Sequence, residues 1–182
     1  FRMRVWNIGG EGQLYVGAIT AAGAGLAIGD QGLAVALPVM VLAGMLGGAL
    51  WAAVPGLLRA YFNTNEILTS LMLNYVGSLL MYYLIFGSSS YWRDQSPAAQ
   101  VFPQGKQIAG SSWWPGFVGP GVIVPLGFVL GIVCAVVLFV AVRSTRFGFR
   151  LRLVSDSPRA ALYAGVRTKR TVVLVMLLSG AL

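Results

Sequence analysis

The chain has 182 residues, of which 57% are hydrophobic and only 10% are charged, and its net charge is +8. A soluble domain carries about 25% charged residues, so this composition excludes a soluble protein and indicates an integral membrane protein. The positive charge lies in loops between apolar runs. No soluble domain is left to present it to a duplex, so we exclude nucleic acid as a partner.

The residue types also limit the chemistry. The chain has no His, and its single cysteine, Cys134, lies inside an apolar run. This excludes a disulfide within the chain and argues against a His/Cys metal site or a Cys–His nucleophile. The Gly-x-x-x-x-Gly-Lys-Ser/Thr loop that holds ATP phosphates is absent from the sequence as well. We therefore expect no catalytic residue, no metal site and no cofactor.

The first apolar run covers residues 14–28 and follows Arg2, Arg4 and the polar segment 7–13. Its 15 residues rise about 22 Å as a helix, which is short of the roughly 30 Å hydrocarbon core of a bilayer. Either this helix is short, or the segment 7–13 lies within membrane depth. The Gly-Asp-Gln-Gly sequence at 29–32 predicts the first turn.

The second predicted helix covers residues 33–54 and ends at Pro55-Gly56. Residues 57–65 then form a short interfacial connection that carries Arg59. This helix and the fourth one each contain two glycines four residues apart, a spacing that lets another helix come close. The pairs are Gly44 with Gly48 and Gly127 with Gly131.

The third predicted helix covers residues 66–86 and the fourth covers 121–142. The segment 88–120 between them is polar and rich in Pro and Gly. It carries three tryptophans that suit the membrane–water boundary: Trp92, Trp113 and Trp114. A fifth apolar run begins near Val172 and offers about 11 residues, whereas a membrane span needs roughly 20. We expect a fragment of a longer protein, with four full spans and a truncated fifth.

The distribution of positive charge predicts the topology. The segment 143–170 holds eight of the 13 basic residues, and basic loops mark the cytoplasmic face. If this segment is cytoplasmic, alternation places Arg59 and the N-terminus inside, and Asp30 and 88–120 outside. Only two basic residues then fall outside: Arg93 and Lys106. The predicted fold is an all-α, polytopic transmembrane helix bundle that forms a single domain over residues 1–182.

The basic segment contains the signature of a short helix. Ser157 can serve as N-cap, Pro158 occupies the first helical position, and Gly165 can end the helix. Asp156 lies beside the positive end of the helix dipole, where an acid is favoured. The alternative is a solvated segment that only orients the protein, with anionic lipid headgroups as secondary partners. The capped helix favours a docking role, because orientation needs only charge.

A polar stripe runs along the third predicted helix. Its members fall on one helical face: Glu66, Thr69, Ser70, Asn74, Gly77 and Ser78. Polar groups in hydrocarbon are costly unless they face protein or water. The stripe therefore either hydrogen-bonds a neighbouring helix or lines a solute pathway, and both interpretations stay open. Glu66, next to Arg59 at the inner boundary, is better explained as an interfacial ion or a first-turn acid.

Asn7 and Glu11 are four residues apart and are predicted to share a helical face. Three nearby glycines loosen the backbone, as at the start of a broken helix whose freed amides and polar side chains meet a solute. The alternative is an ordinary helix with Asn7 as its cap and Glu11 as an acid favoured by the dipole.

Three motifs make the chain resemble a known family. The segment Trp6-Asn-Ile-Gly-Gly-Glu-Gly-Gln-Leu-Tyr-Val-Gly-Ala18 resembles a signature of permease subunits in bacterial ABC importers for branched-chain amino acids, simple sugars and nucleosides. The segment Asn65-Glu-Ile-Leu-Thr-Ser-Leu-Met-Leu-Asn-Tyr75 is similar to a second signature of the nucleoside and simple-sugar branch. Residues 145–165 and 179–182 resemble the family's cytoplasmic loop and following span. The family usually has Gly in place of Ser155 and often Asn in place of Ser157, but either serine can still cap the helix.

The resemblance implies a mechanism, partners and a location in a bacterial inner membrane. The short helix would be a coupling helix seated in a separate ATP-binding subunit; its residues are Asp156, Ser157, Pro158, Arg159, Ala160, Ala161 and Gly165. An extracytoplasmic solute-binding lipoprotein would contact 88–120, and a second permease subunit, identical or different, would complete the pathway. The pathway candidates are Asn7, Glu11, Gln13, Thr69, Ser70 and Asn74. The expected function is ATP-driven import of a nucleoside or simple sugar, with ATP hydrolysis on the partner and no enzymatic activity in this chain.

Two other functions remain open at this point. Glu11 could be the ion or proton site of a secondary transporter. The chain could also be a membrane scaffold whose polar stripe only joins helices. The sequence does not identify the solute.

Overall fold

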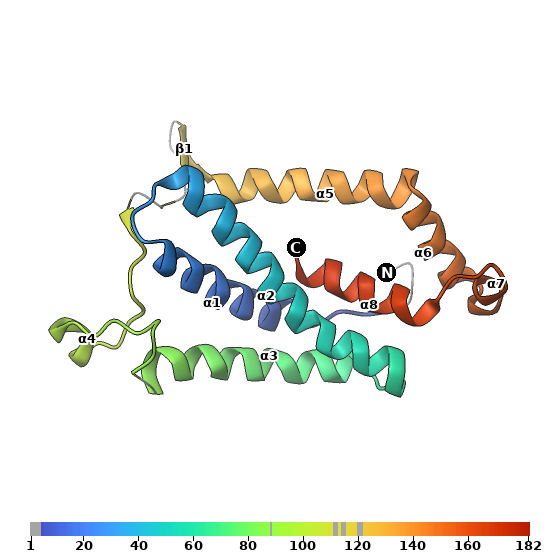
Figure 1. Ribbon diagram of the computed structural model, residues 1–182, viewed down its shortest axis with the longest axis horizontal. Helices are drawn as coiled ribbons and strands as arrows, with labels where there is room; N and C mark the ends of the chain where they lie inside the picture. Colours follow the sequence, from blue (N-terminus) through green and yellow to red (C-terminus); the bar gives the residue numbers. More distant parts are fainter. Residues whose placement is uncertain (1–4, 88, 111–112, 114–115, 120–121) are drawn as a thin grey trace.

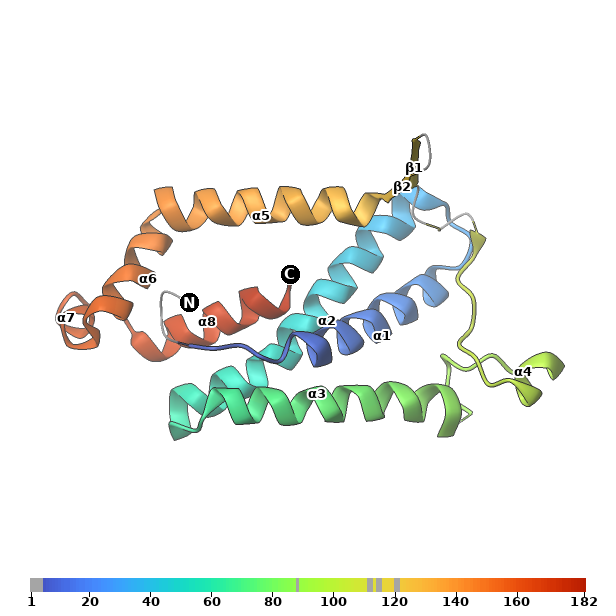
Figure 2. The same cartoon turned by 180° about the vertical axis from the view of Figure 1, so that it is seen from behind.

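A computed structural model describes residues 5–87, 89–110, 113, 116–119 and 122–182. Most of the described residues are helical, and Figures 1 and 2 show two long helices lying along the long axis with other helices inclined between them. In chain order the helices are α1 Gly10–Ile28, α2 Leu33–Phe62, α3 Glu66–Tyr82, the π-helix η1 Tyr83–Gly87, α4 Pro97–Val101, α5 Leu126–Ser144, α6 Arg146–Asp156, α7 Pro158–Tyr163 and α8 Thr168–Gly180. Strands β1 Gly116–Gly119 and β2 Val122–Pro125 form an antiparallel hairpin. The predictions for Arg2, Arg4, Ser88, Trp114, Pro120 and Gly121 concern positions outside the described residues.

The all-α membrane fold is confirmed. Within the described ranges, three segments are long and apolar enough to cross a bilayer: α2, α3 with η1, and α5. The predicted count of four full spans is therefore too high by this measure. Helix α1 has 19 residues but is not among the three, because Glu11 and Gln13 lie in its first turns and lower its mean hydropathy. Helix α8 has 13 residues.

Helix α2 does not end at Pro55, so that prediction and the separate connection over 57–65 are wrong. The helix continues for 30 residues through both Pro38 and Pro55. It ends where Asn63 adopts a left-handed conformation with φ 54°. An internal proline removes one main-chain hydrogen bond. Ending the helix at membrane depth would instead leave several main-chain groups without partners, so the continuous helix is favoured.

Small residues bring three helices together. A Cβ added at Gly44 would lie 3.4 Å from the Gly17 carbonyl oxygen, and one added at Gly48 would lie 2.1 Å from the Gly180 carbonyl oxygen. The predicted close packing at Gly44 and Gly48 is thus confirmed, with α1 and α8 as the partners. Gly131 in α5 faces open space. Helix α5 has no buried residue, and its main contacts are with α6 and β2.

The connections gather at two opposite ends of the molecule (Figure 1). One end, which we call the basic end, holds the last turn of α2, which contains Arg59, and the segment 143–170. The other, which we call the loop end, holds the connection from α1 to α2, which contains Asp30, together with α4 and the β-hairpin. This arrangement agrees with the predicted alternation of the connections.

Candidate functional site

Helix α1 begins opposite the middle of α3. A Cβ added at Gly12 would lie 2.8 Å from the Leu73 carbonyl oxygen, and one added at Gly77 would lie 3.1 Å from the Gly12 Cα. Asn74 is eight residues beyond the start of α3, which corresponds to about 12 Å of helical rise. The first turn of α1 therefore lies beside the middle of α3, in a segment long and apolar enough to cross a bilayer, which favours the interpretation that places residues 7–13 within membrane depth.

Three polar side chains meet at this helix start. The Asn7 amide nitrogen donates to Gln13 Oε1 at 3.1 Å and to Ser179 Oγ at 2.9 Å. Gln13 Nε2 donates back to Asn7 Oδ1 at 2.9 Å. Gln13 is only 5% exposed. These contacts join the segment before α1 to the end of α8.

Asn74 attaches α3 to the same point. Its Oδ1 accepts from the Gly12 main-chain N–H at 2.8 Å, and its Nδ2 donates to the Ile8 carbonyl at 2.9 Å. Asn7 Oδ1 similarly accepts from the Gly9 N–H at 3.0 Å. The first amides of a helix have no partner within the helix, and no water is available in hydrocarbon. The two asparagines supply what solvent cannot. We call Asn7, Gln13, Asn74 and Ser179 the polar cluster.

The predicted pathway residues separate into two groups. Asn7, Gln13 and Asn74 lie in the polar cluster, and the fully buried Ser70 lies beside it, near Gly9. The other two lie outside it. Glu11 is exposed and accepts a hydrogen bond from the Tyr15 hydroxyl at 3.3 Å. The Thr69 hydroxyl donates to carbonyls of its own helix.

The predicted shared face of Asn7 and Glu11 is wrong, because α1 begins at Gly10 and its N-cap is Gly9. Asn7 therefore precedes the helix, and its side chain does not cap α1 from the N-cap position. Glu11 is a first-turn acid, as the alternative interpretation proposed. At the basic end, Glu66 is buried and pairs with Arg59 at 3.2 Å between Oε2 and Nε, and its interpretation as a first-turn acid is confirmed.

Ser179 is a cluster residue that sequence reasoning missed as a site. It is 172 residues from its partner Asn7, so no local pattern could connect the two. The only signal was its position in a motif that resembles the family. A cavity of about 540 Å³ lies next to the cluster, between α1, α2 and α8. Gln13 and Ser179 provide polar atoms to its wall.

At the basic end the structure contains the predicted short helix as α7. The Ser157 hydroxyl accepts from the Ala160 N–H at 3.3 Å. Gly165 ends the helix with φ 74°, and its N–H bonds to the Leu162 carbonyl while the Val166 N–H bonds to the Ala161 carbonyl. This pair of bonds is a Schellman motif. Helix α7 is therefore closed at both ends by its own sequence.

The preceding helix α6 was not predicted, since its arginines were interpreted as loop charge. Thr145 is its N-cap, and Gly148, Leu151 and Val154 are buried along it. That spacing of three was the missed signal. Of the proposed coupling residues, Ala161 is fully buried, whereas Asp156, Arg159 and Ala160 are exposed. Tyr163, at the last position of α7, is 94% exposed.

The loop end is anchored on α1. The Trp92 indole N–H donates to the Ile19 carbonyl at 2.9 Å, and the ring lies against Gly23. Beside it, Asp94 accepts from the main-chain N–H and the hydroxyl of Ser96, both at 3.0 Å. These hydrogen bonds hold the pKa of the Asp94 carboxyl below its ordinary value of 3.8. The turn therefore keeps these bonds at neutral pH and loses them only as the pH falls through that lowered pKa.

Comparisons with known proteins agree with this architecture. The glucose ABC transporter permease protein TsgB13 of Haloferax volcanii is 35% identical over 97% of this chain and 47% of its own length. The nucleoside ABC transporter permease protein NupB of Lactococcus lactis is 29% identical, and the guanosine ABC transporter permease protein NupP of Bacillus subtilis is 30% identical. Each match covers 100% of this chain and 50% of the relative. The chain thus spans about half the length of these relatives. No solved structure matches significantly.

The model of one permease family matches residues 1–182, the whole chain. Together with helices suited to a membrane and the ABC permeases among its relatives, this match establishes that the chain belongs to the family described as the permease component of branched-chain amino acid transport systems.

Proposed function

We propose that this chain forms part of the membrane-spanning subunit of an ATP-driven importer, with α7 as the helix that docks to a separate ATPase. The observation that carries the proposal is the closed, six-residue α7 held at the basic end with Tyr163 94% exposed. An exposed aromatic side chain on a rigid element is suited to fill a pocket of a partner protein.

The polar cluster supports the transport part of the proposal. A helix that starts at membrane depth, with amides and polar side chains around it, is the type of site that transporters use for polar solutes. The adjacent cavity of about 540 Å³ falls within the usual size range of small-molecule sites. Gln13 and Ser179 can exchange hydrogen bonds with the hydroxyls of a sugar or a nucleoside. The names of the relatives, which specify glucose, nucleosides and guanosine, point to the same solutes.

The proposal includes partners and an orientation. The basic end faces the cytoplasm of a bacterial cell and carries the ATPase, in accord with the positive-inside rule. The loop end receives solute from an extracytoplasmic binding protein. A second permease subunit completes the pathway. ATP binding closes the ATPase pair, and the helices seated in it carry that motion into the membrane, which opens the pathway to each side in turn.

The first test is capture of the ATPase. Tyr163→Asp should weaken the affinity for the ATPase at least about 30-fold, since burial of an interface aromatic contributes about 2 kcal/mol or more. The amount of ATPase that co-purifies should fall accordingly. The matched control is Phe102→Asp, which changes an exposed aromatic at the loop end that is 79% exposed. That variant should bind the ATPase normally. Equal binding by both variants would contradict the docking role of α7.

The second test concerns the energy source. Glu11→Gln should leave ATP-driven uptake of labelled guanosine or glucose within about twofold of wild type, because Glu11 is exposed and lies outside the polar cluster, and glutamine can still accept from Tyr15. Uptake is measured in vesicles that contain the assembled transporter, with and without ATP. Uptake that ignores ATP, follows a proton gradient and is lost in Glu11→Gln would show a proton-coupled transporter instead.

A further inference from the structure

The corner between α5 and α6 at the basic end is unusually tight. Helix α5 ends at Ser144 and α6 begins at Arg146, so Thr145 is the single residue between them. A Cβ added at Gly148 would lie 1.8 Å from the Val142 carbonyl oxygen. The backbone of α6 therefore presses directly on the last turn of α5, and only glycine fits at the contact.

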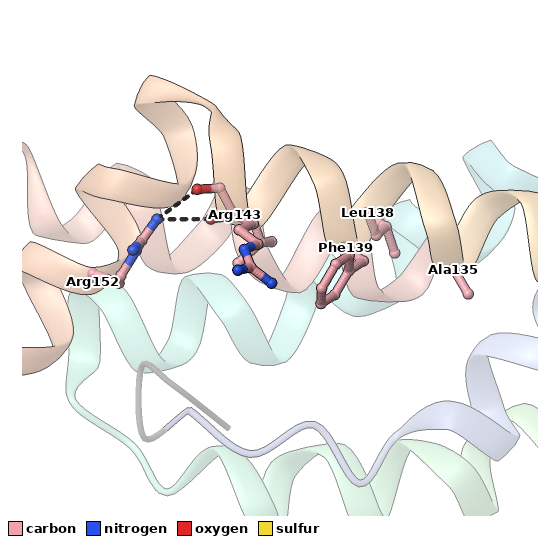
Figure 3. Close-up of a pocket in the computed structure, with 6 residues that line it drawn as sticks. Ala135, Leu138, Phe139, Arg143 and Arg152 are labelled. Atoms are coloured by element: carbon pink, nitrogen blue, oxygen red, sulfur yellow. Dashed lines mark hydrogen bonds between the residues drawn. The ribbon is translucent and has the colours of Figure 1, made fainter.

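Arg152 holds this corner closed from the side of α6 (Figure 3). Its Nη2 donates to the Arg143 carbonyl at 2.9 Å and to the Val142 carbonyl at 3.4 Å, and its Nε donates to the Gly148 carbonyl at 3.4 Å. The last carbonyls of a helix have no partner within the helix. A guanidinium at this position satisfies them and is attracted by the negative end of the α5 dipole.

Other arginines nearby do not share this role. Arg143 extends along α5, with its guanidinium 5.8 Å from the centre of the Phe139 ring. Arg146 and Arg150 on α6 are exposed, and no hydrogen bond of their side chains is found in the described part of the chain. Arg150 carries the same charge two residues from Arg152 and is therefore a matched control.

The next corner is equally short. Ser157 is the single residue between α6 and α7. Its N–H donates to the Leu153 carbonyl at 3.1 Å, and its carbonyl accepts from the Ala161 N–H at 3.0 Å. Ala161 is fully buried, and α6 packs on α7. Helices α5, α6 and α7 thus form one arm without a flexible linker, from the membrane span to the exposed Tyr163.

We propose that Arg152 is a positioning residue for transport, which locks α6 to the end of α5 so that a displacement of α7 moves the α5 span. The inference rests on the proposed function, because it assigns α7 to the ATPase. Arg152 acts through the carbonyls of α5 and contacts neither solute nor ATP. Without the hydrogen bonds of Arg152 to α5, the ATPase still docks and hydrolyses ATP. The angle between α5 and α6 then changes instead, and α5 does not follow the displacement of α7.

The experiment compares the vesicle-reconstituted transporter, complete with its ATPase, as wild type, Arg152→Gln, Arg152→Lys and Arg150→Gln. The measured quantity is solute taken up per ATP hydrolysed. Arg152→Gln should retain the ATPase and its hydrolysis rate but lower this ratio about tenfold, because several charge-assisted hydrogen bonds are lost. Arg152→Lys should give an intermediate ratio, since an ammonium group keeps the charge but not the planar fork. Arg150→Gln should match wild type.

A distance measurement reports on the corner directly. Spin labels are placed at Val137 on α5 and Arg159 on α7, both exposed, in a background where the exposed Cys134 is replaced by serine. The distance distribution should be narrow and unchanged by ATP in wild type, and broad in Arg152→Gln. If Arg152→Gln does not accumulate in the membrane, Arg152→Lys serves for both readouts.

Three outcomes separate the proposals. A wild-type ratio of uptake to hydrolysis in the Arg152 variants would overturn the proposed positioning role of Arg152. Loss of the ATPase from Arg152→Gln would also overturn it, because the residue would then act in docking. Absence of ATP-driven uptake in the wild type would reject the proposed function. In that case the label distances would still decide whether Arg152 holds α5 and α6 together.

Discussion

Gly48→Ala is expected to be strongly destabilising, although it adds only one methyl group. The added carbon would lie 2.1 Å from the Gly180 carbonyl oxygen. Because the contact is with main-chain atoms of another glycine, no side chain can move aside to relieve it. Helices α2 and α8 must then separate, which also disturbs the end of α8 that supports Ser179. Overpacking of a well-packed core costs typically 1–3 kcal/mol, and we expect a value of about 3 kcal/mol because the clash is with backbone. Thermal unfolding of the detergent-solubilised permease measures it.

The matched control is Gly131→Ala in α5. A Cβ at Gly131 meets nothing within 4 Å, so this substitution should be neutral or stabilising by up to about 1 kcal/mol through helix propensity. The reciprocal change Gly180→Ala, whose Cβ would lie 2.4 Å from the Gly48 carbonyl oxygen, should reproduce the loss. Equal melting temperatures for Gly48→Ala and Gly131→Ala would show that α2 and α8 do not approach each other in this way.

Asn74→Leu is expected to abolish uptake and to loosen the start of α1. Leucine has a similar volume but removes the acceptor of the Gly12 N–H and the donor to the Ile8 carbonyl. Both main-chain groups lie at membrane depth, where each unsatisfied group costs about 1–3 kcal/mol. We expect a total loss of roughly 2–6 kcal/mol for the two groups together. Unfolding midpoints and uptake in vesicles measure the two effects.

Ser78→Ala is the control on the same stripe. The Ser78 hydroxyl donates to the Tyr75 carbonyl within α3. Its removal therefore breaks no hydrogen bond to another helix. Its removal should change stability by less than about 0.5 kcal/mol. If Asn74→Leu behaved like Ser78→Ala, the hydrogen bonds between α1 and α3 would not be important for the fold or for transport.

Local sequence signals predicted one of the two short helices at the basic end. The boundaries of α7 follow from Ser157, Pro158 and Gly165, which act within one turn of themselves. Helix α6 was not predicted, because its three arginines mask the periodicity of its buried residues. The hydrogen bonds of Arg152 to α5 could not be inferred either. That side chain reaches carbonyls nine and ten residues away, across a corner whose angle is a property of the packed helices.

The Pro55-Gly56 pair in α2 does not end the helix, because packing on α8 and the lipid environment outweigh the local signal. A Pro-Gly pair ordinarily predicts a helix end. Here a Cβ at Gly56 would lie 2.9 Å from the Met176 Cβ, so the pair is in the contact with α8. Within lipid, continuation of the helix costs one hydrogen bond, while a break exposes several main-chain groups.

The sequence by itself determined the membrane class, the alternation of the connections and the capped α7, because apolar length, charge and capping act over a few residues. Only the tertiary structure decided which polar residues meet. Asn7 joins Gln13 and Ser179, Asn74 holds the start of α1, and Glu11 is left outside. The physical reason is that amides freed at membrane depth must find partners on other helices, and which helices lie near enough depends on the glycine contacts that set their spacing.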